Sequence, residues 1–178
     1  MMHQMPDYSL VAKRYLLCPS FPTGLAIKSS FNNRCKIGEQ AGTYNSETKR
    51  SIIRINGKNY RCSRVVYYLA TGVDPGLNEV DHIDQDSSNN NIQNLRLANR
   101  SQNAANMKLK SNNATGFKGV SWHKARDLFR CTIALNGKSK QLANHICPLR
   151  LAYEYNVFAK EHYKEFAVLN QIPKLGCK

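Results

Sequence analysis

The segment that decides the fold is EVDHIDQD, residues 79–86, which places four carboxylates and one histidine within eight residues. The chain has 178 residues and a formal net charge of +14, with 26 Lys and Arg against 12 Asp and Glu. One third of its acidic side chains therefore lie in this segment. Asp-rich segments are common in turns, so the cluster alone favours a turn with His82 at the surface.

The residues that follow change this interpretation. Two asparagine-rich segments come next, NNNIQNLRL at 89–97 and RSQNAANM at 100–107. We expect an extended strand at 80–83, a loop, a short strand at 95–98 and a helix capped by Ser101. Such a β-β-α unit can bring three side chains from distant positions to one point: Asp81, His82 and Asn103.

This pattern resembles the HNH nuclease family, in the phage-type branch with the signature DHIDG, NNxxNLR and SQN. The matching residues are Asp81-His82-Ile83-Asp84, Asn89-Asn90, Asn94-Leu95-Arg96 and Ser101-Gln102-Asn103. In this branch an asparagine replaces the last histidine, as at Asn103. The family commonly has glycine where this chain has Gln85, and a positive φ at that position would strain a glutamine. The resemblance implies a ββα-metal motif at about 79–109.

The resemblance also implies metal-dependent hydrolysis of DNA phosphodiester bonds. His82 is then the general base that takes a proton from water. Asp81 and Asn103 hold one divalent ion, Mg²⁺ or Mn²⁺, because hard cations prefer carboxylate and amide oxygens. Asn94 is placed with His82 in the catalytic group, where it braces the loop and orients the His82 backbone or ring.

Residues 1–109 are predicted to form the nuclease domain, which begins with strands, hairpins and one helix. The segment RSIIRINGKNYRCSR has β-rich runs on both sides of Asn56-Gly57, a pair typical of two-residue hairpin turns. Residues 64–70 then predict a helix that ends at Gly72. Basic residues around this hairpin either follow a DNA backbone or keep a sheet edge soluble.

Residues 110–178 predict a second domain, a three-stranded antiparallel sheet packed on one helix. The strands are expected at 117–123, 128–135 and 138–144, with turns at Arg126-Asp127 and Asn136-Gly137. Pro148 opens the helix, in which apolar side chains recur at helical spacing: Leu151, Ala152, Tyr155, Ala159, Tyr163 and Phe166. The whole chain is therefore expected to be an α+β protein.

The second domain resembles the Apetala-two/ethylene-response-factor DNA-binding domain, as it is appended to phage HNH nucleases. The match lies in Gly116-Phe117-Lys118-Gly119-Val120 and in the helix residues Tyr155, Asn156 and Ala159. It departs at Phe129, where tryptophan is typical, and at 143–145, where Gly-x-Phe is usual. In that family the exposed face of the sheet enters the major groove.

Candidate DNA contacts follow from the two resemblances. Residues 107–178 carry 13 Lys and Arg against 4 Asp and Glu, which indicates a polyanionic partner. The candidates are Arg96, Arg100, Lys118, Trp122, Lys124, Arg126, Arg130, Lys138 and Lys140. Arg96 and Arg100 are equally well explained as solvated arginines, and Trp122 as a core residue. Double-stranded DNA is the expected partner, bound by a monomer or a homodimer.

The lengths of the apolar runs, the N-terminal segment and the spacing of the cysteines argue against several other classes of protein. No run of ~18 apolar residues is present, so no membrane-spanning helix is expected. The N-terminus does not resemble a signal peptide, which favours a cytoplasmic location, in the bacterial host if the protein is phage-encoded. The six cysteines form no CxxC pair, so we expect reduced thiols and no structural zinc.

Two functions from different classes remain open at this point. The first is a metal-dependent HNH endonuclease that nicks DNA or cuts both strands, as homing endonucleases do. The second is a sequence-specific DNA-binding regulator whose HNH unit is inert. RNA cleavage is a weaker third hypothesis, because readout by a sheet in the major groove suits B-form DNA better than RNA.

Overall fold

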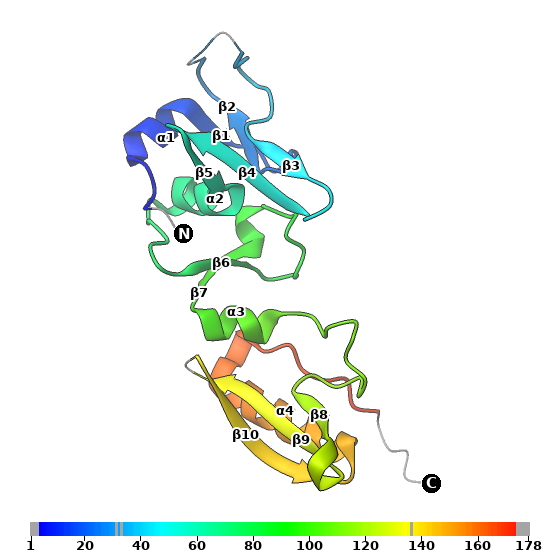
Figure 1. Cartoon of the computed structure of the whole chain (residues 1–178). Coiled ribbons are helices and arrows are strands. Elements are labelled where there is room, and N and C mark those ends of the chain that lie inside the picture. Colours follow the sequence, from blue (N-terminus) through cyan, green and yellow to red (C-terminus); the bar gives the residue numbers. More distant parts are fainter. Residues whose placement is uncertain (1–3, 31, 33, 136, 174–178) are drawn as a thin grey trace. The chain divides into compact units, whose positions relative to one another are not determined.

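The computed structural model describes residues 4–30, 32, 34–135 and 137–173 (Figure 1). The chain divides into two compact units, Met1–Ala98 and Asn99–Lys178. The division between these units falls eleven residues before the boundary that the sequence placed after residue 109. The assignment of residues 1–109 to one functional domain stays a prediction.

The first unit contains three small antiparallel sheets, which pair β1 with β2, β3 with β4 and β5, and β6 with β7. Its elements are α1 (Tyr8–Arg14), β1 (Tyr15–Leu17), β2 (Leu25–Ile27), β3 (Thr43–Asn45), β4 (Arg50–Ile55), β5 (Lys58–Arg61), α2 (Cys62–Thr71), β6 (Glu79–His82), η1 (Ile92–Asn94) and β7 (Leu95–Ala98).

The hairpin between β4 and β5 confirms the predicted two-residue turn. Ile55 pairs with Lys58, and the residues between them, Asn56 and Gly57, have φ angles of 49° and 78°. Both residues adopt the left-handed backbone conformation. The two-residue turns that match the twist of a hairpin require this conformation. Along β4 buried and exposed positions alternate, and the buried Ile53 and Ile55 face the core.

Helix α2 follows β5 directly and ends at Gly72, where the sequence predicted its end. Gly72 has a φ of 73° and donates its backbone N–H to the Tyr68 carbonyl at 2.9 Å. The helix also fixes the segment before β6, because the buried Arg64 side chain donates to the carbonyls of Gly76 and Asn78. These contacts set the position at which β6 begins.

Helix α1 was not expected, since only one helix was predicted before residue 79. Asp7 caps it by accepting the Leu10 backbone N–H at 3.2 Å. Val11 and Tyr15 are buried in the core with residues of β2, β4 and α2. With only seven residues, α1 has too few apolar positions to show a helical period, so the capping aspartate was its one local signal.

The second unit is the predicted three-stranded sheet with one long helix, and the mixed α+β class is confirmed. Its elements are α3 (Arg100–Asn106), β8 (Val120–His123), η2 (Lys124–Arg126), β9 (Leu128–Leu135), β10 (Lys138–His145), α4 (Pro148–Tyr163) and η3 (Lys164–Phe166). The strand order is β10-β9-β8, and every pair is antiparallel. Figure 1 shows α4 against one face of this sheet.

The core of the second unit lies between α4 and the sheet. All six apolar positions predicted at the helix are buried, with Phe166 in η3 just beyond it: Leu151, Ala152, Tyr155, Ala159, Tyr163 and Phe166. Val120, Cys131 and Ile133 are the buried sheet residues. Pro148 occupies the first turn of α4, where its missing N–H costs no helical hydrogen bond.

Two of the differences from the predicted boundaries have a clear local cause. Helix α3 is capped by Asn99 rather than Ser101, because Asn99 and Gln102 form a reciprocal capping box. Strand β8 begins at Val120 instead of residue 117, because Gly119 has a φ of 78° and interrupts the extended backbone. Of the predicted turn at Asn136-Gly137, Asn136 lies outside the described residues.

Within the described residues, the structure shows the state of five cysteines and the length of every helix. Cys18, Cys35, Cys62, Cys131 and Cys147 are free, whereas Cys177 lies outside the described residues. Burial raises the pKa of the Cys62 thiol to about 12, so this group packs as an uncharged side chain. No helix among the described residues has the length and apolar character needed to span a membrane.

Candidate functional site

Strands β6 and β7 form the antiparallel pair of the expected β-β-α unit. Asp81 lies directly opposite Arg96, and His82 lies opposite Leu95. Asp81 is 5% exposed, and its Oδ2 accepts a hydrogen bond from Arg96 Nε at 2.9 Å. Arg96, a candidate phosphate contact, therefore forms an ion pair with the carboxylate that was assigned to the metal.

The His82 ring is oriented by Asn90, whose side chain is buried. His82 Nε2 lies 3.2 Å from Asn90 Oδ1, and Asn90 Nδ2 donates to the Pro22 carbonyl at 2.7 Å. A carbonyl oxygen only accepts, so the amide nitrogen of Asn90 faces Pro22 and its oxygen faces His82. His82 Nε2 must then carry the proton, and the lone pair of the neutral ring lies on Nδ1.

The segment that holds Asn90 comes from the far N-terminal part of the chain. Gly24 has a φ of 72°, and a Cβ atom there would lie 2.9 Å from the Asn90 carbonyl and 2.9 Å from Val66 Cγ2. Only glycine lets the backbone at 22–24 approach Asn90 so closely. No role was predicted for Pro22 or Asn90 from the sequence, although Asn90 belongs to the NN of the family signature.

The loop after β6 is organised by Asp84 and Asn94. Asp84 accepts hydrogen bonds from the Asp86 backbone N–H and from the side-chain amides of Asn89 and Asn94, all at 2.8–2.9 Å. Burial alone would raise the pKa of Asp84, but these hydrogen bonds outweigh it and hold the pKa below its ordinary value. Asp84 thus acts as an ionised acceptor that closes the loop.

Asn94 forms two of the hydrogen bonds that close this loop. Its Oδ1 accepts the Asp84 backbone N–H at 3.0 Å, and its backbone carbonyl accepts the Ile83 N–H at 2.9 Å. The side-chain contact to the His82 ring comes from Asn90 instead. The catalytic role assigned to Asn94 stays a prediction, and the observed contacts place it as a support of the loop.

Gln85 occupies the position where the family commonly has glycine, and its φ is 65°. Its backbone N–H donates to the His82 carbonyl at 2.9 Å, which closes the turn directly after β6. The left-handed conformation is unfavourable for a residue with a Cβ atom. The turn therefore keeps the left-handed backbone that a glycine would adopt at this position, and Gln85 is strained in it.

Asn103, the predicted second metal ligand, lies in α3 of the second compact unit. It is half-buried in the first turns of the helix, and its backbone N–H donates to the carbonyl of the capping Asn99 at 2.9 Å. Because Asp81 and Asn103 belong to different compact units, their sharing of one ion stays a prediction. Arg100 is exposed at the first residue of the same helix.

Two lysines predicted on the exposed face of the sheet lie elsewhere. Lys118 Nζ donates to the carbonyls of Ala105 and Met107 at the end of α3, and burial lowers the pKa of Lys118 to about 8. Lys140 pairs with the buried Ile133 and therefore shares the face that packs on α4. Its Nζ lies 4.9 Å from the centre of the Phe158 ring on α4.

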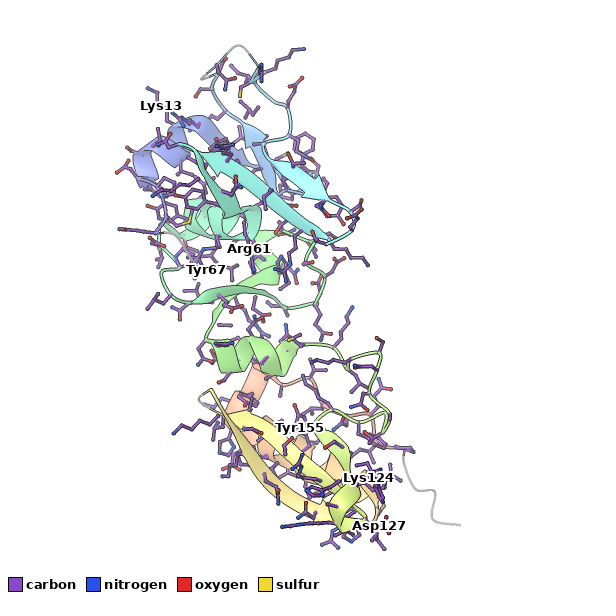
Figure 2. All side chains as sticks on the ribbon, viewed as in Figure 1. Lys13, Arg61, Tyr67, Lys124, Asp127 and Tyr155 are labelled. Carbon is purple, nitrogen blue, oxygen red and sulfur yellow. The ribbon has the colours of Figure 1, made fainter. Side chains whose placement is uncertain are left out.

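The other candidate DNA contacts are distributed over the rest of the sheet. Arg130 pairs with Ser121 and alternates with the buried Cys131, so it faces away from α4. Trp122 is 48% exposed, and its ring meets the Phe129 ring edge-on at 4.8 Å. The remaining three are exposed: Lys124, Arg126 and Lys138. Figure 2 shows Lys124 at the connection between β8 and β9, beside Asp127.

Residues 60–105 match the family model described as HNH endonuclease. The match runs from β5 to α3 and includes all the residues assigned to catalysis and metal binding. It does not reach residues 110–178, so the resemblance of the second unit to the Apetala-two/ethylene-response-factor domain stays a prediction.

Two relatives share parts of this sequence. Protein 3.8 of Escherichia phage T7 is 41% identical over 73 residues, which cover 41% of this chain and 60% of that protein. The uncharacterized HNH endonuclease L560 of Acanthamoeba polyphaga mimivirus is 34% identical over 110 residues, which cover 61% of this chain and 56% of that protein. The chain thus spans less than two thirds of either relative. No solved structure matches.

Proposed function

We propose that this protein is a metal-dependent HNH endonuclease that hydrolyses DNA phosphodiester bonds. The match of residues 60–105 to the HNH endonuclease family supports the reaction class. The observation that carries the proposal is the contact of the buried Asn90 amide with the His82 ring, since it selects the ring nitrogen that carries the lone pair. A histidine whose lone pair is placed on one defined ring nitrogen is suited to act as a general base.

In the proposed mechanism His82 takes a proton from the attacking water through Nδ1. Its Nε2–H stays hydrogen-bonded to Asn90 while the ring becomes an imidazolium, so the ring keeps its orientation through the step. Asn90 is held in turn by the Pro22 carbonyl. Asp84, Asn94 and the turn at Gln85 keep β6 and the following loop in place, which positions His82.

The residues present fit a hard divalent cation such as Mg²⁺ or Mn²⁺. Among the described residues no group of three His, Cys, Asp or Glu side chains is arranged to hold a metal, so an ion at this site would need other ligands. Mg²⁺ commonly binds through one or two protein oxygens and completes its shell with water and substrate phosphate. Asp81 is the buried carboxylate for that role, with Asn103 as the proposed second ligand. A bound ion supplies charge neutralisation at the scissile phosphate and the leaving oxygen.

The proposed substrate is double-stranded DNA. Residues 107–178 carry the larger excess of basic side chains, and the sheet face that bears Arg130 is turned away from α4. We propose that this face lies in the major groove, as the sheet of the Apetala-two/ethylene-response-factor domain does. The sheet would thereby place the nuclease on its target. The proposal includes cleavage in the manner of a homing endonuclease, by a monomer or a homodimer. The proposed location, the cytoplasm of a bacterial host, is supported by the phage source of one relative.

The proposal is tested by incubating supercoiled plasmid with the protein in Mg²⁺, Mn²⁺ or EDTA. Nicked or linear DNA is expected only with a divalent ion. His82→Ala should lower the rate about 10²- to 10⁴-fold, the usual contribution of a general base. His162→Ala is the matched control, because His162 lies on α4 and contacts Phe158 of its own helix.

The outcomes separate the proposed enzyme from a DNA-binding regulator. A wild-type rate in the His82→Ala variant would remove His82 from catalysis. A wild-type protein that binds plasmid but does not cut it in any divalent ion would be a regulator with an inert nuclease unit. Run-off sequencing of both strands of the product then shows whether one strand or two are cut.

A further inference from the structure

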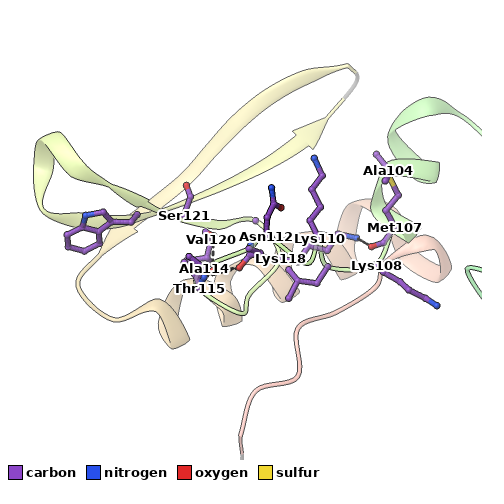
Figure 3. A pocket seen from close by; sticks show the side chains of 14 residues that line it. Ala104, Met107, Lys108, Lys110, Asn112, Ala114, Thr115, Lys118, Val120 and Ser121 are labelled. Carbon is purple, nitrogen blue, oxygen red and sulfur yellow. Dashed lines mark hydrogen bonds between the residues drawn. The ribbon is translucent and has the colours of Figure 1, made fainter.

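The second unit contains a pocket of about 600 Å³ beside the edge strand β8. The end of α3, the following loop at 107–115 and β8 enclose it (Figure 3). Its volume falls within the range of ~300–1,000 Å³ that small-ligand sites occupy. None of the residues that line it is acidic.

Hydrogen bonds hold the walls of this pocket. Lys118 Nζ joins the segment before β8 to the end of α3 through the carbonyls of Ala105 and Met107. Thr115 Oγ1 donates to the Val120 carbonyl at 2.9 Å, and Asn113 Nδ2 donates to the Phe117 carbonyl at 3.1 Å. The loop is therefore tied at both of its ends to residues 117–120, the segment that leads into β8, which gives the pocket a defined shape.

The pocket combines exposed apolar side chains with lysines. Met107, Leu109 and Trp122 are 54%, 41% and 48% exposed, although large apolar side chains are usually covered. Lys108 and Lys110 alternate with two of them along the loop and are also exposed. Figure 3 shows Lys110 and Asn112 projecting in the same direction from the loop. A ligand of this pocket should thus have a flat apolar part and a negative charge.

We propose that this pocket binds an unpaired nucleotide of a DNA strand, with its base against Trp122 and its phosphate at Lys110. The inference rests on the proposed function only in taking DNA as the ligand. Aromatic side chains bind unpaired bases of any sequence by stacking, and lysines bind the backbone phosphates. A base inside a duplex has both faces covered by its neighbours, so the pocket should select frayed, overhanging or single-stranded DNA.

Trp122 is the single tryptophan of the chain, so tryptophan emission reports on this pocket directly. The experiment uses the full-length His82→Ala protein in EDTA, where no cleavage takes place. Three duplexes of one sequence are titrated: blunt, with a short single-stranded overhang, and with the same overhang made abasic. We expect the overhang to quench the emission and to bind about 10- to 100-fold more tightly than the other two.

Two variants test the lysines. Lys110→Ala should weaken binding of the overhang several-fold and leave binding of the blunt duplex unchanged. Lys160→Ala removes the same charge from an exposed position on α4 outside the pocket and should alter neither. Circular dichroism and the emission spectrum without DNA verify that both variants fold.

The proposal fails if the blunt and overhanging duplexes quench Trp122 equally, or if the abasic overhang binds as well as the intact one. Quenching by an RNA overhang but not by the DNA overhang would also overturn it. The result is separate from that of the plasmid experiment, because binding is measured without a metal in a protein that lacks His82. Loss of cleavage with intact quenching would reject only the nuclease proposal.

Discussion

Replacement of Asn90 by alanine tests the part of the site on which the proposed chemistry depends. The variant loses the contact with His82 Nε2 and the donor to the Pro22 carbonyl. Two buried hydrogen bonds contribute about 1–3 kcal/mol together. Because the Ser51 hydroxyl also donates to the Pro22 carbonyl, at 3.2 Å, that oxygen keeps one partner. We therefore expect Asn90→Ala to lower the free energy of unfolding by about 1–2 kcal/mol, a loss that leaves most small domains folded.

The expected loss of activity is larger than this loss of stability suggests. Without Asn90 the His82 ring loses the contact that orients it at Nε2 and holds the proton on that nitrogen. Loss of an orienting contact of this kind lowers activity about 10- to 100-fold. In Asn90→Asp a carboxylate faces the ring instead and favours the imidazolium, which is not a base. Cleavage by this variant should therefore require a higher pH than cleavage by the wild type.

The assay is plasmid nicking at saturating Mn²⁺ across the neutral pH range, with urea denaturation of each variant. Asn59→Ala on the exposed strand β5 is the matched control and should change neither measurement. A folded Asn90→Ala protein that nicks at the wild-type rate with an unchanged pH profile would refute the proposed role of Asn90. An Asn90→Asp protein whose pH profile does not move would refute the contact between the side chain at position 90 and the His82 ring.

Three further predictions concern the backbone and one buried lysine. Gln85→Gly should raise the free energy of unfolding by about 0.5–1 kcal/mol in urea denaturation, because the strain at a φ of 65° is removed; an unchanged or lower stability would contradict this. Gly119→Ala should cost about 2–4 kcal/mol, since its Cβ would press on the Tyr155 ring and lie 2.8 Å from the Thr132 carbonyl. Gly57→Ala has the same φ of 78° with nothing within 4 Å, so it should cost only about 1 kcal/mol, and equal losses would exclude the crowding argument. Lys118 has a pKa lowered to about 8 in the folded protein, so between that pH and its ordinary value of 10.5 the unfolded chain binds more protons. The wild type should then gain stability relative to Lys118→Met as pH rises through this window, and parallel curves for the two proteins would contradict it.

The features predicted correctly from the sequence depend on residues that are close together in the chain. Asn56 and Gly57 specify the hairpin because both tolerate a positive φ. Gly72 ends α2 for the same reason. The strands β6 and β7 were expected from apolar residues beside the polar cluster, and the sheet with α4 was expected from its turn residues and helical period.

The errors arose where competing local signals were similar or absent. Ser101 and Asn99 are both good caps, and the reciprocal bond with Gln102 selects Asn99. Lys118 and Lys140 were expected on the exposed face from the resemblance to the Apetala-two/ethylene-response-factor domain. A lysine has a long apolar stem, however, and its ammonium can serve carbonyls or an aromatic ring inside the fold.

The sequence determined which residue types stand at the candidate site, because a histidine, carboxylates and asparagines at these intervals suit one kind of chemistry. It did not determine how the His82 ring is held. That depends on a hydrogen bond between Asn90 and Pro22, which are 68 residues apart, and on the close approach of the backbone at Gly24. Local propensity acts over a few neighbouring residues, whereas contacts of this kind exist only after the core has brought distant segments together. The tertiary structure alone therefore decided which nitrogen of His82 carries the proton.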